Sequence, residues 1–257
     1  MNNLKYEMVL VEPGKFLMGS DMGFENEKPA HLVEITRPYY IGKYEVTFDL
    51  YDIFSNEIQK DGIEPEATIR GNRPAMGMNW VEAVSFCNWL SEKEGYALCY
   101  TIKGVATECD FLANGYRLPT EAEWEFAAIG GIQSKGYLYS GSDDADEVSW
   151  YNENFGSDFQ PVGLKKPNEL GLYDMSGNMW EWCWDYWDEN YYDYSPTKDP
   201  LGPSKIPKQN YPYEVEKSRR SNRWLNTVEY MRPSTRSADF INYEGDNGLR
   251  LVRTKVD

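Results

Sequence analysis

Histidine and cysteine, the residues that most often carry out chemistry in proteins, are scarce in this chain. His31 is the single histidine, and the four cysteines are Cys87, Cys99, Cys109 and Cys183. A Ser–His–Asp triad would depend on His31, which stands at the expected start of a strand and is better explained as a solvated or capping residue. No cysteine pair has the CxxC spacing of a zinc or redox site. Cys99 and Cys109 are near enough in sequence to bridge a hairpin, and free buried thiols are the alternative for all four.

A second candidate for chemistry is the pair Asn178 and Glu181, three residues apart beside Gly177. Carboxylate, amide and backbone carbonyl oxygens are the ligands that calcium prefers, and a turn at a glycine exposes such carbonyls. A structural calcium ion near Asn178 and Glu181 is therefore one interpretation. The other is that Glu181 is a buried, hydrogen-bonded acid. We expect no other metal and no cofactor.

The charge of the chain excludes one broad class of partner. It has 26 Lys and Arg against 42 Asp and Glu, a formal net charge of −16. Such a field repels phosphate backbones, so nucleic-acid binding is not expected, and an anionic membrane surface is disfavoured for the same reason. No apolar run approaches the roughly 18 residues of a transmembrane helix. The first seven residues lack a signal-peptide core, which fits a cytoplasmic protein and equally a mature domain without its leader.

Arginines gather in the C-terminal part of this acidic chain. We expect Arg232, Arg236, Arg250 and Arg253 to form bidentate pairs with Asp and Glu inside a loop-rich core. Residues 221–247 differ in kind, because Ser, Asn, Thr, Tyr, Asp and Phe dominate there and aliphatic residues are few. That composition is typical of a recognition loop, and also of an ordinary polar surface loop.

The elements that must position these residues are best defined in the first half of the chain. A helix over 80–94 has Asn79 as its N-cap, Glu82 completing a capping box and Gly95 at its end. A second helix follows Pro119, and a short one starts near Thr47. The pattern predicts strands at 8–12, 16–19, 31–36, 39–46 and 248–253, irregular structure beyond residue 130, and a surface excursion over 186–217. We expect a single domain over residues 1–257.

Five motifs, in order along the chain, resemble the formylglycine-generating enzyme (sulfatase-modifying factor) family. They lie at 11–19, 40–47, 116–125, 171–182 and 248–253. The resemblance implies an α+β, C-type-lectin-like fold with two main helices, a small antiparallel sheet and much irregular structure. It also implies an enzyme that oxidises a substrate cysteine to formylglycine with copper bound by a cysteine pair in the C-terminal third.

This chain departs from the family at that cysteine pair. The corresponding stretch, 228–236, contains no cysteine, although thiolates are the ligands that select Cu(I). The related sulfoxide synthases need three iron-binding histidines, and this chain has one. We therefore expect that this chain is not an enzyme. The alternative is a formylglycine-generating-type oxidase that acts on substrate cysteines.

The C-terminal segment also resembles the variable proteins of diversity-generating retroelements, which vary at positions whose template codons contain adenine. Those proteins usually carry Arg-Gly-Gly-Ser-Trp before the variable loop; this chain has Arg220-Ser221-Asn222-Arg223-Trp224. The resemblance implies a receptor-like or adhesin-like binding protein, displayed at the cell surface or outside the cell, often as a lipoprotein. Residues 218–253 would be the variable segment, and the ligand a protein, with carbohydrate as the alternative.

We expect a few exposed residues on a rigid base to form the ligand surface, with Phe240 and Tyr243 as its anchors. The predicted ligand-binding residues are Ser221, Asn222, Arg223, Leu225, Asn226, Thr227, Thr235, Asp239, Phe240, Asn242 and Tyr243.

Overall fold

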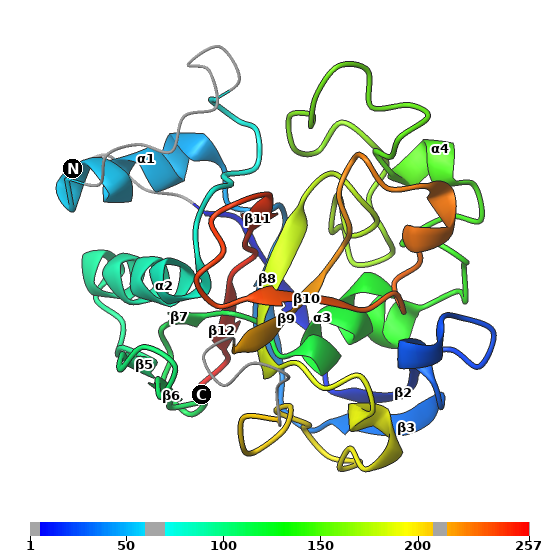
Figure 1. Ribbon diagram of the computed structural model, residues 1–257, viewed down its shortest axis with the longest axis horizontal. Helices are drawn as coiled ribbons and strands as arrows, with labels where there is room; N and C mark the ends of the chain where they lie inside the picture. The colour runs from blue at the N-terminus through cyan, green and yellow to red at the C-terminus, as the bar shows by residue number, and fades with distance from the viewer. Residues whose placement is uncertain (1–5, 60–69, 208–214, 257) are drawn as a thin grey trace.

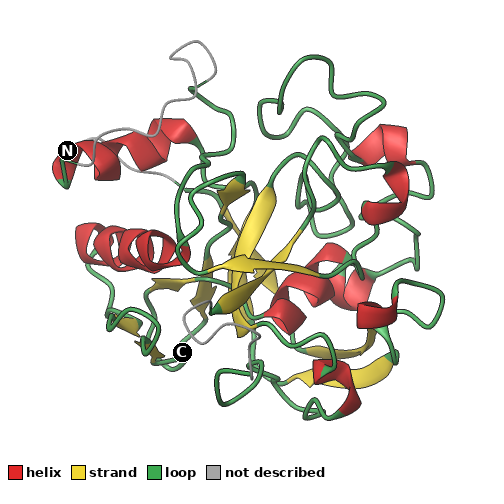
Figure 2. Cartoon of the chain, in the orientation of Figure 1, coloured by secondary structure: helices red, strands yellow, loops and turns green. Residues whose placement is uncertain are grey.

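A computed structural model describes residues 6–59, 70–207 and 215–256 of the chain. The expectation about a signal peptide concerns the first seven residues, of which 1–5 lie outside the described residues. The predicted surface excursion over 186–217 also lies partly outside them. In the described part, a few helices surround small central sheets, and irregular segments connect them (Figures 1 and 2). This arrangement confirms the predicted α+β, C-type-lectin-like class. No described helix has both the length and the apolar character needed to cross a membrane.

Two four-stranded sheets form the centre of the molecule. The first has the order β1 (Met8–Val11), β4 (Tyr39–Gly42), β12 (Val252–Thr254) and β7 (Tyr116–Arg117), all antiparallel. The second has the order β10 (Ser237–Phe240), β9 (Glu216–Arg220), β8 (Trp180–Tyr186) and β11 (Asn247–Gly248), in which only β8 and β11 run parallel. The second sheet carries the C-terminal segment that the sequence singles out.

Hairpins and helices flank these sheets. Figure 1 shows helices α1 and α2 at one end of the molecule and the hairpin of β2 and β3 at the other. The hairpins are β2 (Gly14–Met18) with β3 (His31–Ile35), and β5 (Tyr100–Thr101) with β6 (Glu108–Cys109). The helices are α1 (Phe48–Glu57), α2 (Trp80–Glu94), α3 (Glu121–Ala128) and α4 (Ala145–Val148), with 3-10 turns η1 (Glu25–Glu27), η3 (Gly131–Gln133), η4 (Tyr191–Asp193) and η5 (Val228–Tyr230).

The two capping boxes form as predicted. The Asn79 side chain accepts the Glu82 backbone N–H, and the Glu82 carboxylate accepts the N–H of Asn79. Thr120 and Glu123 exchange the same pair of bonds at the start of α3. Thr47 occupies the N-cap position of α1 but makes no side-chain cap bond there. The local hydrogen-bonding pattern therefore sets where α2 and α3 begin.

The second half of the chain contains more regular structure than its sequence predicts. Strand β8 is buried on both faces, so it lacks the alternation of polar and apolar residues that would have indicated a strand. The predicted strand over 248–253 is instead two short strands, β11 and β12. Between them Arg250 turns inward to Glu181. The predicted surface excursion over 186–217 lies partly in the core, because Tyr191 and Tyr192 are buried.

The cysteines are all free, so the Cys99–Cys109 bridge is not formed. Cys87, Cys99 and Cys183 are buried, and burial raises the pKa of each of these thiols. Cys99 directly precedes β5, and the residue opposite Cys109 in the β5–β6 pair is Tyr100.

Candidate functional site

An open cavity of about 330 Å³ lies where the second sheet meets the C-terminal loops. Strand β9 supplies Arg219, β8 supplies Trp180 and β10 supplies Ser237 and Asp239. Residues from the loops and η5 close the remaining sides. The lining residues are Trp180, Arg219, Arg223, Asn226, Tyr230, Arg236, Ser237, Asp239, Tyr243 and Asp246.

The strand register explains why these side chains meet. Arg219 is directly opposite Ser237 on β10 and Trp182 on β8, so side chains two residues further along each strand lie on the same face. That rule brings Asp239 and Trp180 beside Arg219. The guanidinium of Arg219 stacks over the Trp180 ring, with Cζ 4.3 Å from its centroid.

Polar contacts around Arg219 organise the cavity floor. Its Nη1 donates to Asp239 Oδ2 at 2.6 Å and to Asn247 Oδ1 at 3.0 Å, and its Nε donates to Ser237 Oγ at 3.3 Å. Burial lowers the pKa of Arg219, while Asp239 and Asp246 oppose that shift. Arg223 forms an ion pair with Asp246 at the side of the cavity.

The opposite face of the same sheet holds a buried charge network against α3. Arg236 borders the cavity, but its guanidinium lies on the α3 side, where it binds Glu121 through Nε at 2.8 Å and Nη2 at 2.9 Å. Arg220 donates to Glu121 at 3.0 Å and also pairs with Glu125. Burial favours the neutral form of Glu121, but Arg236 and Arg220 outweigh it and its pKa is lowered. The carboxylate of Glu121 thus stays ionised in the core.

Two further ion pairs connect the C-terminal segment to distant parts of the chain. Arg232 holds Glu27 through two bonds of 2.7 Å, and Arg250 donates to Glu181 at 2.7 Å. These contacts confirm the internal pairing predicted for Arg232, Arg236 and Arg250. The same prediction is wrong for Arg253, which stacks on the Tyr96 ring with Cζ 3.7 Å from its centroid; within the described ranges it has no carboxylate partner.

The structure divides the eleven predicted ligand-binding residues into three groups. Arg223, Asn226, Asp239 and Tyr243 line the cavity. Leu225, Phe240 and Asn242 are exposed but do not line the cavity, and Thr227 is half-buried just before η5. The third group, Ser221, Asn222 and Thr235, is buried.

That burial corrects the expectation that Ser221, Asn222 and Thr235 lie exposed. Ser221 and Asn222 have φ values of 81° and 79°, in the left-handed region that favours glycine. The Ser221 hydroxyl donates towards the carbonyls of Asp174 and Gly177, and the Asn222 amide donates to the Tyr230 carbonyl. Ser221 and Asn222 therefore belong to the rigid base, and Thr235 is buried with them.

Six lining residues were not among the predicted ligand-binding residues. Arg236 was assigned only an internal role, and the other five had no assigned contact with a ligand. Trp180 lies in the 171–182 motif, and Arg219 precedes the Arg-Ser-Asn-Arg-Trp segment, so both had a sequence signal. Tyr230, Ser237 and Asp246 gave no distinguishing signal. The six are Trp180, Arg219, Tyr230, Arg236, Ser237 and Asp246.

The side chains of Asn178 and Glu181, which could bind calcium, already form hydrogen bonds within the protein. The carboxylate of Glu181 accepts bonds from Arg250 and from Trp124 Nε1, and the Asn178 amide donates to the Gln160 carbonyl. Glu181 is thus the buried, hydrogen-bonded acid of the second interpretation. Calcium binding at this place stays a prediction.

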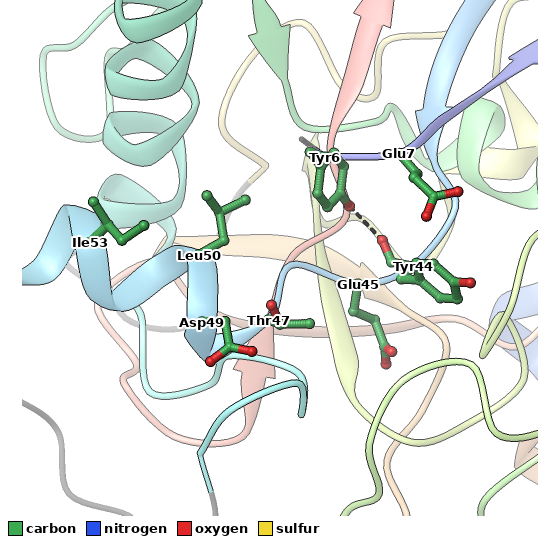
Figure 3. A pocket seen from close by; sticks show the side chains of 8 residues that line it. All are labelled: Tyr6, Glu7, Tyr44, Glu45, Thr47, Asp49, Leu50 and Ile53. Atoms are coloured by element: carbon green, nitrogen blue, oxygen red, sulfur yellow. Dashed lines mark hydrogen bonds between the residues drawn. The ribbon is translucent and has the colours of Figure 1, made fainter. Parts of the chain in front are cut away.

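A second cavity, of about 270 Å³, lies outside the C-terminal segment, beside α1 (Figure 3). Tyr6 points its hydroxyl at the Tyr44 carbonyl there, and Leu50 and Ile53 supply apolar surface. Glu45 also lines this cavity although its side chain is almost wholly buried, and burial together with Asp174 raises the pKa of its carboxyl. The predicted ligand-binding residues do not line this cavity.

Comparison with known proteins identifies the family of the chain. The model of the sulfatase-modifying factor enzyme 1-like domain family matches residues 2–255. The chain belongs to this family. A Paenibacillus barcinonensis protein named chaperone protein LppX is 34% identical over 97% of this chain and 90% of its own length. The formylglycine-generating enzyme of Streptomyces coelicolor is 31% identical, over 56% of this chain and 42% of its own length.

Among solved structures, Treponema denticola variable protein 1 superposes with a TM-score of 0.80 at 28% identity, covering 97% of this chain and 95% of that one. The suspected resemblance to the enzyme family and to a variable protein is thereby confirmed. The lining of the cavity does not fit the copper of the enzymes: it offers guanidinium, carboxylate, amide, hydroxyl and aromatic groups, and its described residues include no thiolate.

Proposed function

We propose that this family member is a non-enzymatic ligand-binding protein that displays changeable side chains on a C-type-lectin-like scaffold. The observation that carries the proposal is the division of segment 221–247. Its buried residues Ser221 and Arg236 are bonded to distant parts of the chain. Its exposed residues include Leu225, Phe240 and Asn242, together with Tyr243, which lines an open cavity. Such a segment can change its surface without changing its backbone.

The anchoring contacts support this reading. Arg232 and Ser234 both bond to Glu27, and Arg236 is held by Glu121. Before these anchors Leu225 is exposed, and after them Phe240, Asn242 and Tyr243 are exposed. A surface presented by a pre-ordered backbone binds without a large ordering cost.

The proposed partner is a protein, with carbohydrate as the alternative. Exposed aromatic side chains next to adaptable polar groups suit protein recognition. Similarity to the Treponema variable protein and to LppX supports a location at the cell surface or outside the cell.

Two matched libraries test the proposal. The first randomises the exposed positions Leu225, Phe240, Asn242 and Tyr243, and the second randomises the buried positions Ser221, Asn222 and Thr235. Displayed on yeast, the first library should remain folded and yield binders to immobilised test proteins, and the second should lose folded display. Equal loss of folding in both libraries would contradict the division on which the proposal rests.

The alternative function, oxidation of substrate cysteines, is favoured by the similarity to formylglycine-generating enzymes. It predicts copper-dependent oxygen consumption with a cysteine-containing peptide. Because the cavity offers no thiolate among its described residues, we expect oxygen consumption to equal that of copper and peptide without protein.

A further inference from the structure

Two arginines in the cavity have more hydrogen-bond donors than protein acceptors. A guanidinium carries five N–H groups. Arg219 donates hydrogen bonds to protein acceptors through Nε and Nη1, and Arg223 donates through Nη1. Within residues 6–59, 70–207 and 215–256, Nη2 of both arginines and Nε of Arg223 have no protein acceptor, and none of these atoms is enclosed. Arg236, in contrast, uses Nε, Nη1 and Nη2.

One ion pair in the cavity exposes its cation more than its anion, while the side chains of Arg219 and Asp239 in another are each 15% exposed. The side chain of Arg223 is 39% exposed, whereas that of its partner Asp246 is 9% exposed. Asp239 accepts bonds from Arg219, from Asn247 and from the Phe240 backbone N–H. An incoming group therefore meets the guanidinium of Arg223 before the carboxylate of Asp246, although the chain as a whole is acidic.

The shape of the cavity limits what can reach these donors. Its volume of about 330 Å³ is near the lower end of the roughly 300–1,000 Å³ typical of small-ligand sites. Trp180, Tyr230 and Tyr243 provide aromatic surface around the arginines. This space suits one side chain or chain end with a planar anionic head better than a large cofactor.

We propose that Arg219 and Arg223 bind a carboxylate group of the partner protein in this cavity. The inference rests on the proposed function and specifies the chemistry recognised at the same site. The planar fork of a guanidinium matches the two oxygens of a carboxylate, and charge-assisted pairs of this kind are stronger than neutral hydrogen bonds. An anion between the two arginines would also offset their mutual repulsion, which contributes to the lowered pKa of Arg219.

The test is an NMR titration of the ¹⁵N-labelled chain that follows the arginine Nε–H signals. N-acetylglutamate α-methylamide carries only a side-chain carboxylate, and N-acetylalanine carries only a chain-end carboxylate. N-acetylglutamine α-methylamide is the matched neutral control. One or both carboxylates should shift the signals of Arg219 and Arg223 with a Kd on the order of 1–10 mM, and the neutral amide should not.

Arg223→Gln removes the accessible guanidinium and should weaken carboxylate binding at least about tenfold. Arg37→Gln, at an exposed arginine outside the cavity, should leave the Kd unchanged. A change of carboxylate affinity in Arg37→Gln as large as that in Arg223→Gln would overturn the proposal.

Equal shifts by the neutral amide, or binding of inorganic phosphate without binding of either carboxylate, would also overturn the proposal. The library experiment separates this failure from that of the proposed function. If carboxylates do not bind but the exposed-position library yields folded binders, only the carboxylate inference is wrong. If carboxylates bind but that library unfolds, the proposed function is wrong.

Discussion

Arg219 and Arg220 are neighbours on β9, yet they belong to two different regions of the molecule. The side chain of Arg220 is fully buried on the face towards α3, where Glu121 and Glu125 hold it. Arg219 points to the other face, where it forms the cavity floor with Trp180. Because side chains alternate along a strand, one residue step separates the charge network of the framework from the cavity. The two faces of β9 thus divide structural charges from those available to a ligand.

This comparison teaches that an arginine's role depends on what its donors already bind. In the framework, each guanidinium meets carboxylates that burial would otherwise leave uncompensated, so its loss should damage the fold. In the cavity, Arg223 is half-exposed and has donors to spare, so its loss should damage binding. The predictions below separate these two consequences.

The largest effect is expected for Arg220→Ala. The substitution leaves Glu125 buried without its arginine partner and removes one of the two arginines from Glu121. Breaking a buried ion pair on one side costs about 3–5 kcal/mol, so urea unfolding should show a loss of that size. Arg223→Ala is the matched control on the cavity side and should cost less than about 1 kcal/mol, because Arg223 is 39% exposed and Asp246 keeps Arg219 at 3.8 Å. Similar losses in the two variants would refute the division between the faces of β9.

A smaller, pH-dependent effect is expected for Glu27→Gln. Burial would raise the pKa of Glu27, but bonds from Arg232, Phe24 and Ser234 outweigh it and lower the pKa below 4.5. A lowered carboxyl pKa stabilises the fold above the unfolded-state pKa, and that stabilisation is lost as the pH falls through the folded-state pKa.

Glu27→Gln should therefore reduce the free energy of unfolding by about 2 kcal/mol at pH 7, and the difference from the wild type should shrink below pH 4.5. Urea titrations at pH 7, 5 and 3.5 measure the free energy of unfolding of Glu27→Gln and of the wild type. A difference that stays constant over this range would mean that the Glu27 charge does not anchor the C-terminal segment.

The smallest effect on stability is expected for the double substitution of Phe240 and Tyr243 by Ala. Both side chains are exposed, so the melting temperature should fall by less than about 3 °C. Calorimetry of the double variant beside Arg220→Ala gives the comparison directly. If the two lose stability equally, Phe240 and Tyr243 are core residues and cannot be the anchors of a binding surface.

The sequence alone predicts the helices better than the binding site. Local signals, such as Asn79 with Glu82 and Thr120 with Glu123, define where α2 and α3 start, because capping bonds join residues three apart. Strand β8 gave no such signal, since both of its faces are buried.

The cavity depends on contacts between residues far apart in the chain, such as Trp180 with Arg219, which no local pattern encodes. The composition of residues 221–247 is typical of a recognition loop and also of an ordinary polar surface loop, and it does not distinguish the exposed polar residues from the buried ones. Ser221 and Asn222 show why: their polar groups bond to backbone carbonyls inside the protein instead of facing solvent.

The central claim is that exposed residues of the C-terminal segment change while its anchors stay fixed. Sequencing this gene from many isolates tests the claim most directly. We predict substitutions at adenine-containing codons of exposed positions such as Leu225, Phe240 and Tyr243, with Arg220 and Arg236 constant. An invariant segment, or substitutions as frequent at Arg220 and Arg236 as at the exposed positions, would contradict the account.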